Sequence, residues 1–189
     1  MPPKARFSRE EVIAAAVALV REKRIEALTA RGLGERLGSS ARPIFTVFDS
    51  MEQVQKEVLQ FGISRYQGMV EEEMARGEYP PYKASGMAYI TFAREEKELF
   101  KLLFMRSRSG EEREKDERDI APIIEMIRKN TGLKDADARL FHLEMWAFVH
   151  GLAVMAATDY CMLDRDLISR MVTDIYQGIK SRFCSKGEK

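Results

Sequence analysis

The sequence LTARGLGERLGSSARPIFTVF, residues 28–48, decides the fold of this chain. Thr29 stands where it caps a helix of about two turns, because a threonine hydroxyl accepts hydrogen bonds from the free N–H groups of a helix start. Leu33 and Leu37 are spaced to form the buried face of that helix. Gly38 follows where a left-handed residue reverses the chain, so the pattern predicts a short helix and then a tight turn.

A second short helix is expected after the turn, from Ser40 to Phe48, with Ser40 as its cap. Ile44, Val47 and Phe48 direct its apolar face back toward the first helix. Gly34 supplies the small residue that two steeply crossing helices need at their closest approach. Two short helices joined by a tight glycine turn constitute a helix-turn-helix, and this is the arrangement that we predict.

Helices are expected on both sides of this stretch. Before it, Ser8 and Glu11 fit a capping box for an amphipathic helix that ends around Arg24. After it, a second capping box at residues 50–53 opens a long helix that runs to about residue 76. Further helices are expected at about 82–95, 97–106, 119–130, 135–160 and 164–183. The almost wholly charged stretch 111–118 is expected to be a solvated loop or a frayed helix.

The sequence therefore predicts an all-α fold, because no alternating strand pattern persists anywhere along it. An N-terminal three-helix helix-turn-helix domain, residues 1–50, is expected to be joined by the long helix to a second domain. That second domain, residues 51–189, is expected to be helical and to serve ligand binding and dimerisation. The first turns of the long helix are expected to pack on the N-terminal domain.

The composition is that of a soluble globular protein, with 45% hydrophobic and 32% charged residues. The net charge is only +1, but residues 1–50 carry nine Lys or Arg against six Asp or Glu, so this part is +3 and the rest −2. That asymmetry permits nucleic-acid binding and is weak evidence for it. We expect a cytoplasmic protein without a membrane span, secretory signal, cofactor, metal site or catalytic site, because no motif for any of them occurs.

The N-terminal stretch resembles the DNA-binding domain of the TetR family of bacterial transcriptional regulators over residues 7–59. The residues that carry the resemblance are Leu28-Thr29, Leu33-Gly34, Leu37-Gly38-Ser39-Ser40, Ile44-Phe45-Thr46-Val47-Phe48 and Ser50-Met51-Glu52. Farther along, residues 146–151, WAFVHG, look like a tryptophan–histidine–glycine stretch in the ligand domains of some members. The resemblance implies a sequence-specific DNA-binding regulator, and we expect a repressor.

Three positions depart from the common family pattern. Phe45 is often tyrosine in the family, Val47 is often histidine and Met51 is often lysine, and those polar side chains usually contact phosphates. The departures alter the expected DNA contacts and leave the expected architecture unchanged.

Double-stranded operator DNA is the expected partner, with the helix after the turn entering the major groove N-terminus first. Arg42 in its first turn is the expected base reader, because a guanidinium fits guanine O6 and N7 bidentately. Pro43 is tolerated because it also falls in the first turn. Phosphate contacts suit the residues at a helix N-terminus and on a basic arm. The expected DNA-binding residues are Lys4, Arg6, Thr29, Arg31, Ser39, Ser40, Ala41, Arg42 and Thr46.

The resemblance also implies a two-fold homodimer formed by the last two long helices. The expected interface residues are Ala147, Gly151, Ile168, Met171 and Ile175. Aromatic residues and methionines in the middle helices, beside the polar His150, suggest an apolar pocket for a small apolar or aromatic effector. The expected lining residues are Met87, Phe92, Phe100, Phe104, Met105, Met126, Trp146 and His150. The effector is expected to release the dimer from DNA by moving the long helix.

Two other functions are compatible with the sequence. The first is a helical adaptor of the same fold that binds protein and not DNA, which the three departures at residues 45, 47 and 51 keep open. The second is a helical enzyme that uses His150, with His142 and nearby acidic residues. His142 and His150 lie eight residues apart, roughly 80° round a helix, and no known metal or catalytic motif contains them.

Overall fold

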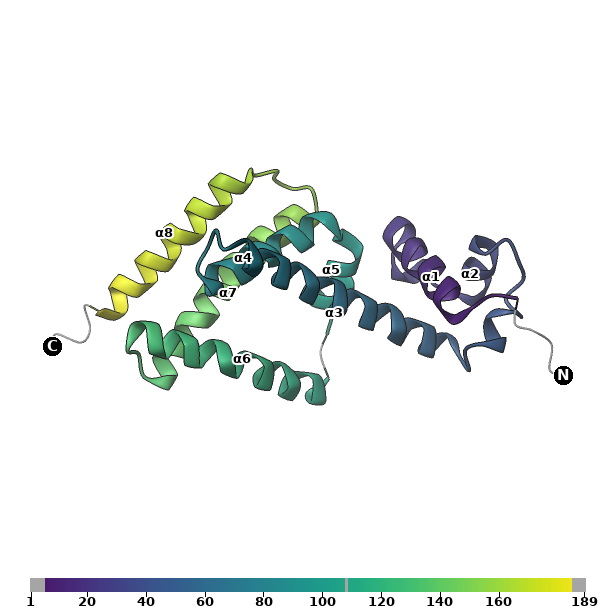
Figure 1. Cartoon of the computed structure of the whole chain (residues 1–189), viewed down its shortest axis with the longest axis horizontal. Helices are drawn as coiled ribbons and strands as arrows, with labels where there is room; N and C mark the ends of the chain where they lie inside the picture. Colours follow the sequence, from purple (N-terminus) through teal and green to yellow (C-terminus); the bar gives the residue numbers. More distant parts are fainter. Residues whose placement is uncertain (1–5, 108, 185–189) are drawn as a thin grey trace. The chain divides into compact units, whose positions relative to one another are not determined.

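The computed structural model describes residues 6–107 and 109–184, with the side chains of residues 111–113, 116 and 184 left out of the description. Over the described residues the chain forms eight α-helices and two short 3₁₀ helices and contains no strand (Figure 1). This confirms the predicted all-α fold.

The elements follow one another along the chain with short connections. They are α1 (Arg9–Lys23), η1 (Ile25–Ala27), α2 (Ala30–Arg36), η2 (Ile44–Thr46), α3 (Met51–Arg76), α4 (Pro81–Glu95), α5 (Lys97–Phe104), α6 (Gly110–Thr131), α7 (Asp135–Ala157) and α8 (Arg165–Cys184).

The helices divide into two compact units, and the division differs from the boundary expected at residue 50. The N-terminal unit contains the described residues up to Gly68 together with Glu95–Arg106, and the C-terminal unit contains Met69–Arg94 and the described residues after Arg106. The N-terminal unit includes the first part of α3, whose first turns were expected to pack on the N-terminal domain. It also includes the whole of α5, which the sequence had assigned to the second domain. Both elements contribute fully buried apolar side chains to the core of this unit.

The core of the N-terminal unit is built on α1. The predicted capping box is confirmed, because the Ser8 hydroxyl accepts from the Glu11 N–H at 3.1 Å and the Glu11 carboxylate accepts from the Ser8 N–H at 2.7 Å. Side chains from five elements and from the connection before α3 are buried here: Val12, Ala16, Val17, Leu19 and Val20 of α1, Leu33 of α2, Ile44 of η2, Val54 and Val58 of α3, Leu99, Phe100 and Leu103 of α5, and Phe48 of the connection. Burying this apolar face is what holds the short helices α2 and η2, which are too short to be stable alone.

An ion pair fixes the start of α5 against α1. The Glu96 side chain is 10% exposed, and its carboxylate accepts from Arg21 Nε at 2.8 Å and Nη2 at 2.5 Å. Arg65 of α3 lies 3.8 Å from the same carboxylate. A bidentate guanidinium–carboxylate contact constrains the orientation of both partners, so Glu96 connects three helices of the N-terminal unit.

One sequence prediction about a helix was wrong. The predicted helix from Ser40 to Phe48 is instead a series of turns that ends in η2, Ile44–Thr46. Proline disfavours the α conformation of the residue before it, so Pro43 opposes an α-helix through Arg42. The β-branched side chains at 44, 46 and 47 add to this effect, because they lose side-chain freedom in a helix.

The charged stretch 111–118 is helical, as the first turns of α6. Of the two alternatives expected here, a solvated loop or a frayed helix, the structure has the helix. The stretch has no apolar stripe, which is why the periodicity left both alternatives open. Glutamate, arginine and lysine nevertheless have high helix propensity, and oppositely charged residues three or four apart support one another. Glu117 in this stretch also accepts a hydrogen bond from Arg139 of α7, which attaches the stretch to the next helix.

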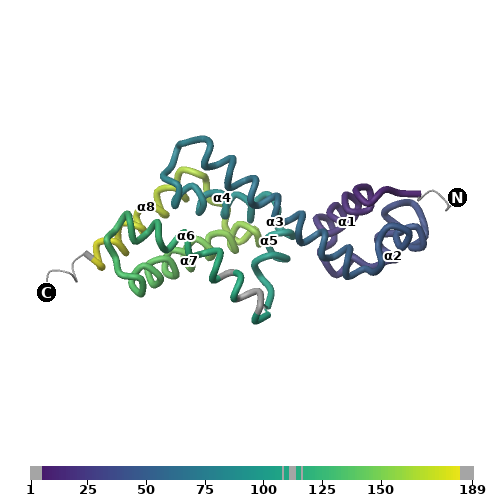
Figure 2. Tube along the Cα trace, turned by 60° about the horizontal axis from the view of Figure 1, so that its bottom comes forward, coloured from purple at the N-terminus to yellow at the C-terminus, as the bar shows by residue number. Residues whose placement is uncertain are grey.

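The C-terminal unit contains the last part of α3, α4 without its final residue Glu95, and α6, α7 and α8 (Figure 1, Figure 2). Its buried side chains include Met87, Tyr89, Ile90 and Phe92 of α4, Ile124 and Ile127 of α6, Phe141, Met145, Val149 and Leu152 of α7, and Ile168 and Val172 of α8. Within the described part of the chain one helix, α7, is long and apolar enough to cross a membrane by length and composition alone. Core helices of soluble proteins pass the same test, and the side of α7 that carries Phe141 and Val149 is buried in this unit.

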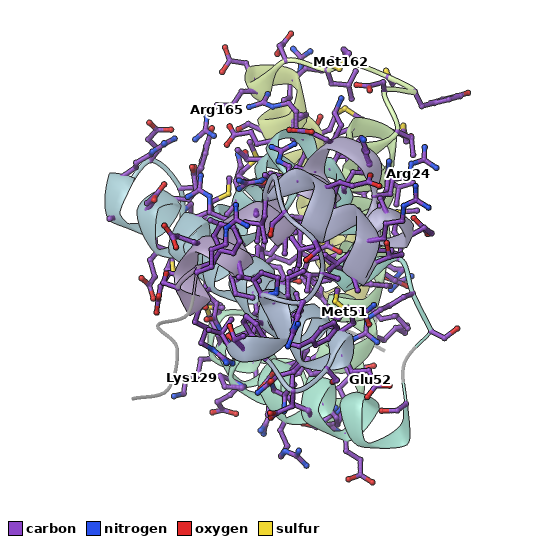
Figure 3. All side chains as sticks on the ribbon, turned by 90° about the vertical axis from the view of Figure 1, so that its right-hand side faces the viewer. Arg24, Met51, Glu52, Lys129, Met162 and Arg165 are labelled. Carbon is purple, nitrogen blue, oxygen red and sulfur yellow. The ribbon has the colours of Figure 1, made fainter. Side chains whose placement is uncertain are left out.

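A charged cluster connects the start of α8 to the end of α3. Arg165, labelled in Figure 3, donates to Glu73 at 2.5 Å and to Glu78 at 3.0 Å. Glu73 is only 4% exposed and also pairs with Arg76 at 3.2 Å. The hydrogen bond to Glu73 raises the pKa of Arg165 above its usual value. The cluster therefore pairs the buried carboxylate of Glu73 with two guanidinium groups.

Candidate nucleic-acid interface

The turn between α2 and η2 has the geometry that the glycines predicted. Gly38 adopts a φ of +63°, and its N–H bonds to the Glu35 carbonyl at 3.1 Å. Ser39 N–H bonds to the Gly34 carbonyl at 2.9 Å. A Cβ placed on Gly34 would lie 2.9 Å from the Ser40 carbonyl carbon and 3.0 Å from the Ala41 nitrogen. Gly34 is therefore the point of closest approach between α2 and the chain after the turn.

We call residues 39–47 the reading segment. Ile44 and Phe48 anchor it by burying their side chains in the N-terminal unit. Arg9 of α1 holds its C-terminal end: Nη1 donates to the Val47 carbonyl at 3.2 Å, and the guanidinium lies 4.3 Å from the centre of the Phe48 ring. Arg9 also pairs with Glu57 of α3 at 2.5 Å. The packing and these contacts together fix which side of the reading segment faces outward.

Sequence reasoning missed Arg9 and Glu57. The two residues that Arg9 contacts, Val47 and Glu57, lie 38 and 48 residues away in the sequence, so no local spacing reveals the contacts. Arg9 looks like an ordinary exposed residue in the first turn of an amphipathic helix. The signal that the sequence did offer is its place as the first residue of α1, directly after the N-cap Ser8.

Two of the predicted DNA-binding residues lie at the start of α2. The Thr29 hydroxyl accepts from the Gly32 N–H at 3.0 Å, which confirms its role as the N-cap of α2. Arg31 is 90% exposed and pairs with Glu35 at 2.9 Å, and this pair raises the pKa of Arg31 above its usual value. Arg31 is thus a surface cation already shared with a neighbouring carboxylate.

The other predicted residues lie on or beside the reading segment. Arg6 Nη1 donates to the Ser39 hydroxyl at 3.1 Å, so the residue before α1 contacts the start of the segment. Ser40 and Arg42 are exposed, and Ala41 is partly exposed. The Thr46 hydroxyl donates to the Pro43 carbonyl at 2.6 Å. Lys4 lies outside the described residues.

The eight predicted effector-binding residues are shared between the two units. Phe100, Phe104 and Met105 belong to the N-terminal unit, where the Phe104 ring contacts the rings of Phe100 and Tyr66 at centroid distances of 5.4 Å. Met87, Phe92, Met126, Trp146 and His150 belong to the C-terminal unit, where Met87 and Phe92 are buried.

Two tyrosine–histidine pairs join α4 to α7. The Tyr82 hydroxyl lies 3.0 Å from His142 Nδ1, and the Tyr89 hydroxyl lies 2.9 Å from His150 Nδ1. Burial lowers the pKa of both histidines below its usual value and raises the pKa of Tyr82. The half-exposed Trp146 ring stacks on His150 with 4.8 Å between the ring centroids. These pairs satisfy polar groups inside a largely apolar contact between two helices.

A small crevice in the C-terminal unit lies between α4, α7, α8 and the connection before α8. Its volume is about 10 Å³, and its lining includes Ile90, Arg94, Leu152 and Ile168. This is room for about one water molecule. Among the described residues no group of three or more histidine, cysteine, aspartate or glutamate side chains is placed to hold one metal ion.

The predicted dimer residues differ in how much surface they offer. Ala147 is exposed, and Gly151, Met171 and Ile175 are partly exposed, whereas Ile168 is buried inside its own unit. Sequence reasoning did not assign to the interface three exposed apolar side chains on α7: Leu140, Leu143 and Trp146, which are between 44% and 57% exposed. These residues lie three apart along α7, so they give it an apolar stripe on its exposed side.

Two comparisons with known proteins found similarities, one to a family model over part of the chain and one to a solved structure over most of it. Residues 82–175 match a protein-family model described as the tetracyclin repressor-like, C-terminal domain. A solved structure titled as the fatty acid degradation regulator FadR from Bacillus halodurans is similar in fold, with a TM-score of 0.57 and 15% sequence identity. The similarity covers 90% of this chain and 93% of that chain. The comparison with curated proteins gave no match.

Proposed function

We propose that this chain, which belongs to the TetR family of regulators, is a sequence-specific DNA-binding repressor that a small apolar or aromatic effector releases from its operator. The observation that carries the proposal is the close approach at Gly34, where α2 meets the backbone of the reading segment. The family match covers residues 82–175, and the helix-turn-helix resemblance covers residues 7–59, so two separate parts of the chain support one family.

In this proposal the reading segment enters the major groove. Arg42 contacts guanine, and Ser40 and Ala41 are short enough to let the backbone approach the bases. Arg6, Thr29 and Arg31 contact phosphates, as does Lys4. Ser39 positions Arg6 through their hydrogen bond, and Thr46 supports the segment through its bond to Pro43.

We propose a homodimer formed by α7 and α8, because one helix-turn-helix contacts too little DNA to be specific. The apolar stripe of Leu140, Leu143 and Trp146 on α7 gives this interface its area, with Ala147 and Gly151 allowing close approach. Met171 and Ile175 of α8 contribute from the second helix, and Ile168 supports them from inside the unit. Two reading segments would then meet successive major grooves, roughly 34–36 Å apart.

The effector site in this proposal lies in the C-terminal unit, beside Met87, Phe92, Trp146 and His150, with Met126 at its margin. The crevice of about 10 Å³ near α4 and α7 is too small for an organic molecule, so an effector that entered it would have to separate the helices that line it. Phe100, Phe104 and Met105, which belong to the N-terminal unit, respond to the effector in this scheme. The chain is proposed to act in the cytoplasm and without catalysis.

Selection of bound sequences from a random pool of double-stranded DNA, using the purified full-length protein, tests the function. The expected product is a palindrome whose half-sites lie about one helical turn apart, bound with an affinity that falls steeply as salt is raised. Failure to enrich any sequence, together with weak binding that is insensitive to salt, would refute DNA reading. That result would favour an adaptor that binds protein through the reading segment and its exposed Phe45.

A further inference from the structure

One large aromatic side chain on the reading segment faces outward. Phe45 is 46% exposed, while its neighbours Ile44 and Phe48 are buried at 0% and 2%. The hydrogen bond from Arg9 to the Val47 carbonyl, 3.2 Å long, holds the end of the same segment. Because these anchors fix the rotation of the segment, the exposure of Phe45 is set by the packing of the protein.

Phe45 follows the exposed Arg42 by three residues in a run of 3₁₀-type turns. The N–H groups of Ile44, Thr46 and Val47 each bond to the carbonyl three residues earlier, at 3.1–3.2 Å, which is 3₁₀ winding. In a 3₁₀ helix, side chains three residues apart eclipse one another and are separated by roughly 6 Å along the axis. The reading segment therefore presents an exposed guanidinium and an exposed ring close to one line.

Two hydroxyl groups of the reading segment are already engaged. The Thr46 hydroxyl donates to the Pro43 carbonyl at 2.6 Å, and the Ser39 oxygen accepts from Arg6 at 3.1 Å. Phe45 itself has no hydrogen-bonding group. The contact that its exposed ring offers is therefore apolar.

We propose that Phe45 is a specificity-determining residue that contacts the C5-methyl group of a thymine in the operator. The inference rests on the proposed DNA-binding function and adds a second base contact to that of Arg42. Among the four bases, only thymine places a methyl group in the major groove, and phenylalanine is one of the side chains that contacts it. An exposed ring next to a base-reading arginine selects for that methyl group.

The geometry also predicts where the thymine lies. The separation of roughly 6 Å along the segment compares with a rise of about 3.4 Å per base pair. The contacted thymine is therefore expected within about two base pairs of the guanine contacted by Arg42, in each half-site.

The test compares thymine with uracil in the DNA that the full-length protein selects. Uracil keeps the hydrogen-bonding edge of thymine and lacks only the methyl group. Replacing the predicted thymine by uracil is expected to weaken binding about fourfold in one half-site and about sixteenfold in both. Phe45→Ala is expected to bind thymine and uracil DNA equally, whereas Phe45→Leu keeps part of the discrimination.

Phe61→Ala is the matched control, because Phe61 is an exposed phenylalanine on α3 of the same unit and lies outside the reading segment. It is expected to discriminate uracil as the unaltered protein does. Specific binding without any uracil effect near the guanine, or a uracil effect that survives Phe45→Ala, overturns the thymine contact and leaves the proposed function standing. Failure of the full-length protein to select DNA overturns both.

Discussion

Substituting Gly34 by alanine tests the helix-turn-helix geometry directly. The added Cβ would lie 2.9–3.1 Å from three backbone atoms of Ser39, Ser40 and Ala41. Backbone atoms cannot rotate away, so the reading segment has to move. Overpacking of this kind costs about 1–3 kcal/mol, whereas replacing a helical glycine by alanine gains about 1 kcal/mol of helix propensity. Taking the upper part of that range, because the contacts are with backbone, we expect a net destabilisation of about 1–2 kcal/mol.

Gly68→Ala separates the two effects. Gly68 lies inside α3, and a Cβ placed there meets nothing within 4 Å. This variant should therefore show the propensity gain alone, about 0.5–1 kcal/mol of added stability. The two variants are expected to differ by roughly 3–12 °C in thermal midpoint, since about 1 kcal/mol shifts the midpoint of a protein of this size by roughly 2–4 °C.

The measurement is thermal unfolding of both variants and the unaltered protein, followed by circular dichroism at 222 nm, with DNA affinity measured alongside. Gly34→Ala should lower the midpoint and weaken binding to the selected DNA, because the shift displaces Ser40 and Ala41. If Gly34→Ala raises the midpoint as much as Gly68→Ala does, α2 and the reading segment do not approach as described.

Three further predictions concern other parts of the chain. Glu96→Gln removes the charged partner of Arg21 and should destabilise the protein by about 1–2 kcal/mol in urea unfolding, whereas Glu35→Gln, at an exposed pair, should leave the midpoint unchanged. Burial lowers the pKa of His142, so the unfolded chain binds more protons in acid. Stability should therefore fall as the pH drops below the unfolded value near 6.5, and His142→Gln should flatten that dependence in urea titrations between pH 5 and 8. Arg42→Ala should cost about 1–3 kcal/mol of DNA affinity and relax preference at one base pair per half-site, and uniform weakening on every sequence would instead assign Arg42 to a phosphate.

Features that depend on neighbouring residues could be read from the sequence. The capping box of Ser8 and Glu11, the N-cap Thr29 and the left-handed Gly38 all appear as predicted. Each is decided by contacts within about one helical turn, so the local sequence contains the whole cause. The spacing from Gly34 to the turn also predicted that Gly34 lies where α2 comes closest to the chain after the turn. A short turn leaves little freedom in where the two segments that it joins meet.

Features that depend on distant residues could not be read in this way. The assignment of α5 to the N-terminal unit follows from buried Leu99 and Phe100 and from the ion pair between Glu96 and Arg21, which are 75 residues apart. Apolar periodicity identifies a buried helix face without saying which core buries it. The expected boundary at residue 50 therefore marked the end of the helix-turn-helix motif, while the compact unit is closed by helices from later in the chain.

The same distinction explains the outward face of the reading segment. The sequence placed Arg42 and Phe45 on a predicted α-helix, where residues three apart diverge by about 60° around the axis. From Ala41 to Val47 the chain is instead a run of turns in which the N–H groups of Ile44, Thr46 and Val47 bond to the carbonyls three residues earlier. Such turns bring side chains three residues apart closer to one line than an α-helix does. Arg9, from α1, then fixes which way that line faces. A proline that shortens a helix and an arginine 38 residues away thus determine together which side chains a DNA groove would meet.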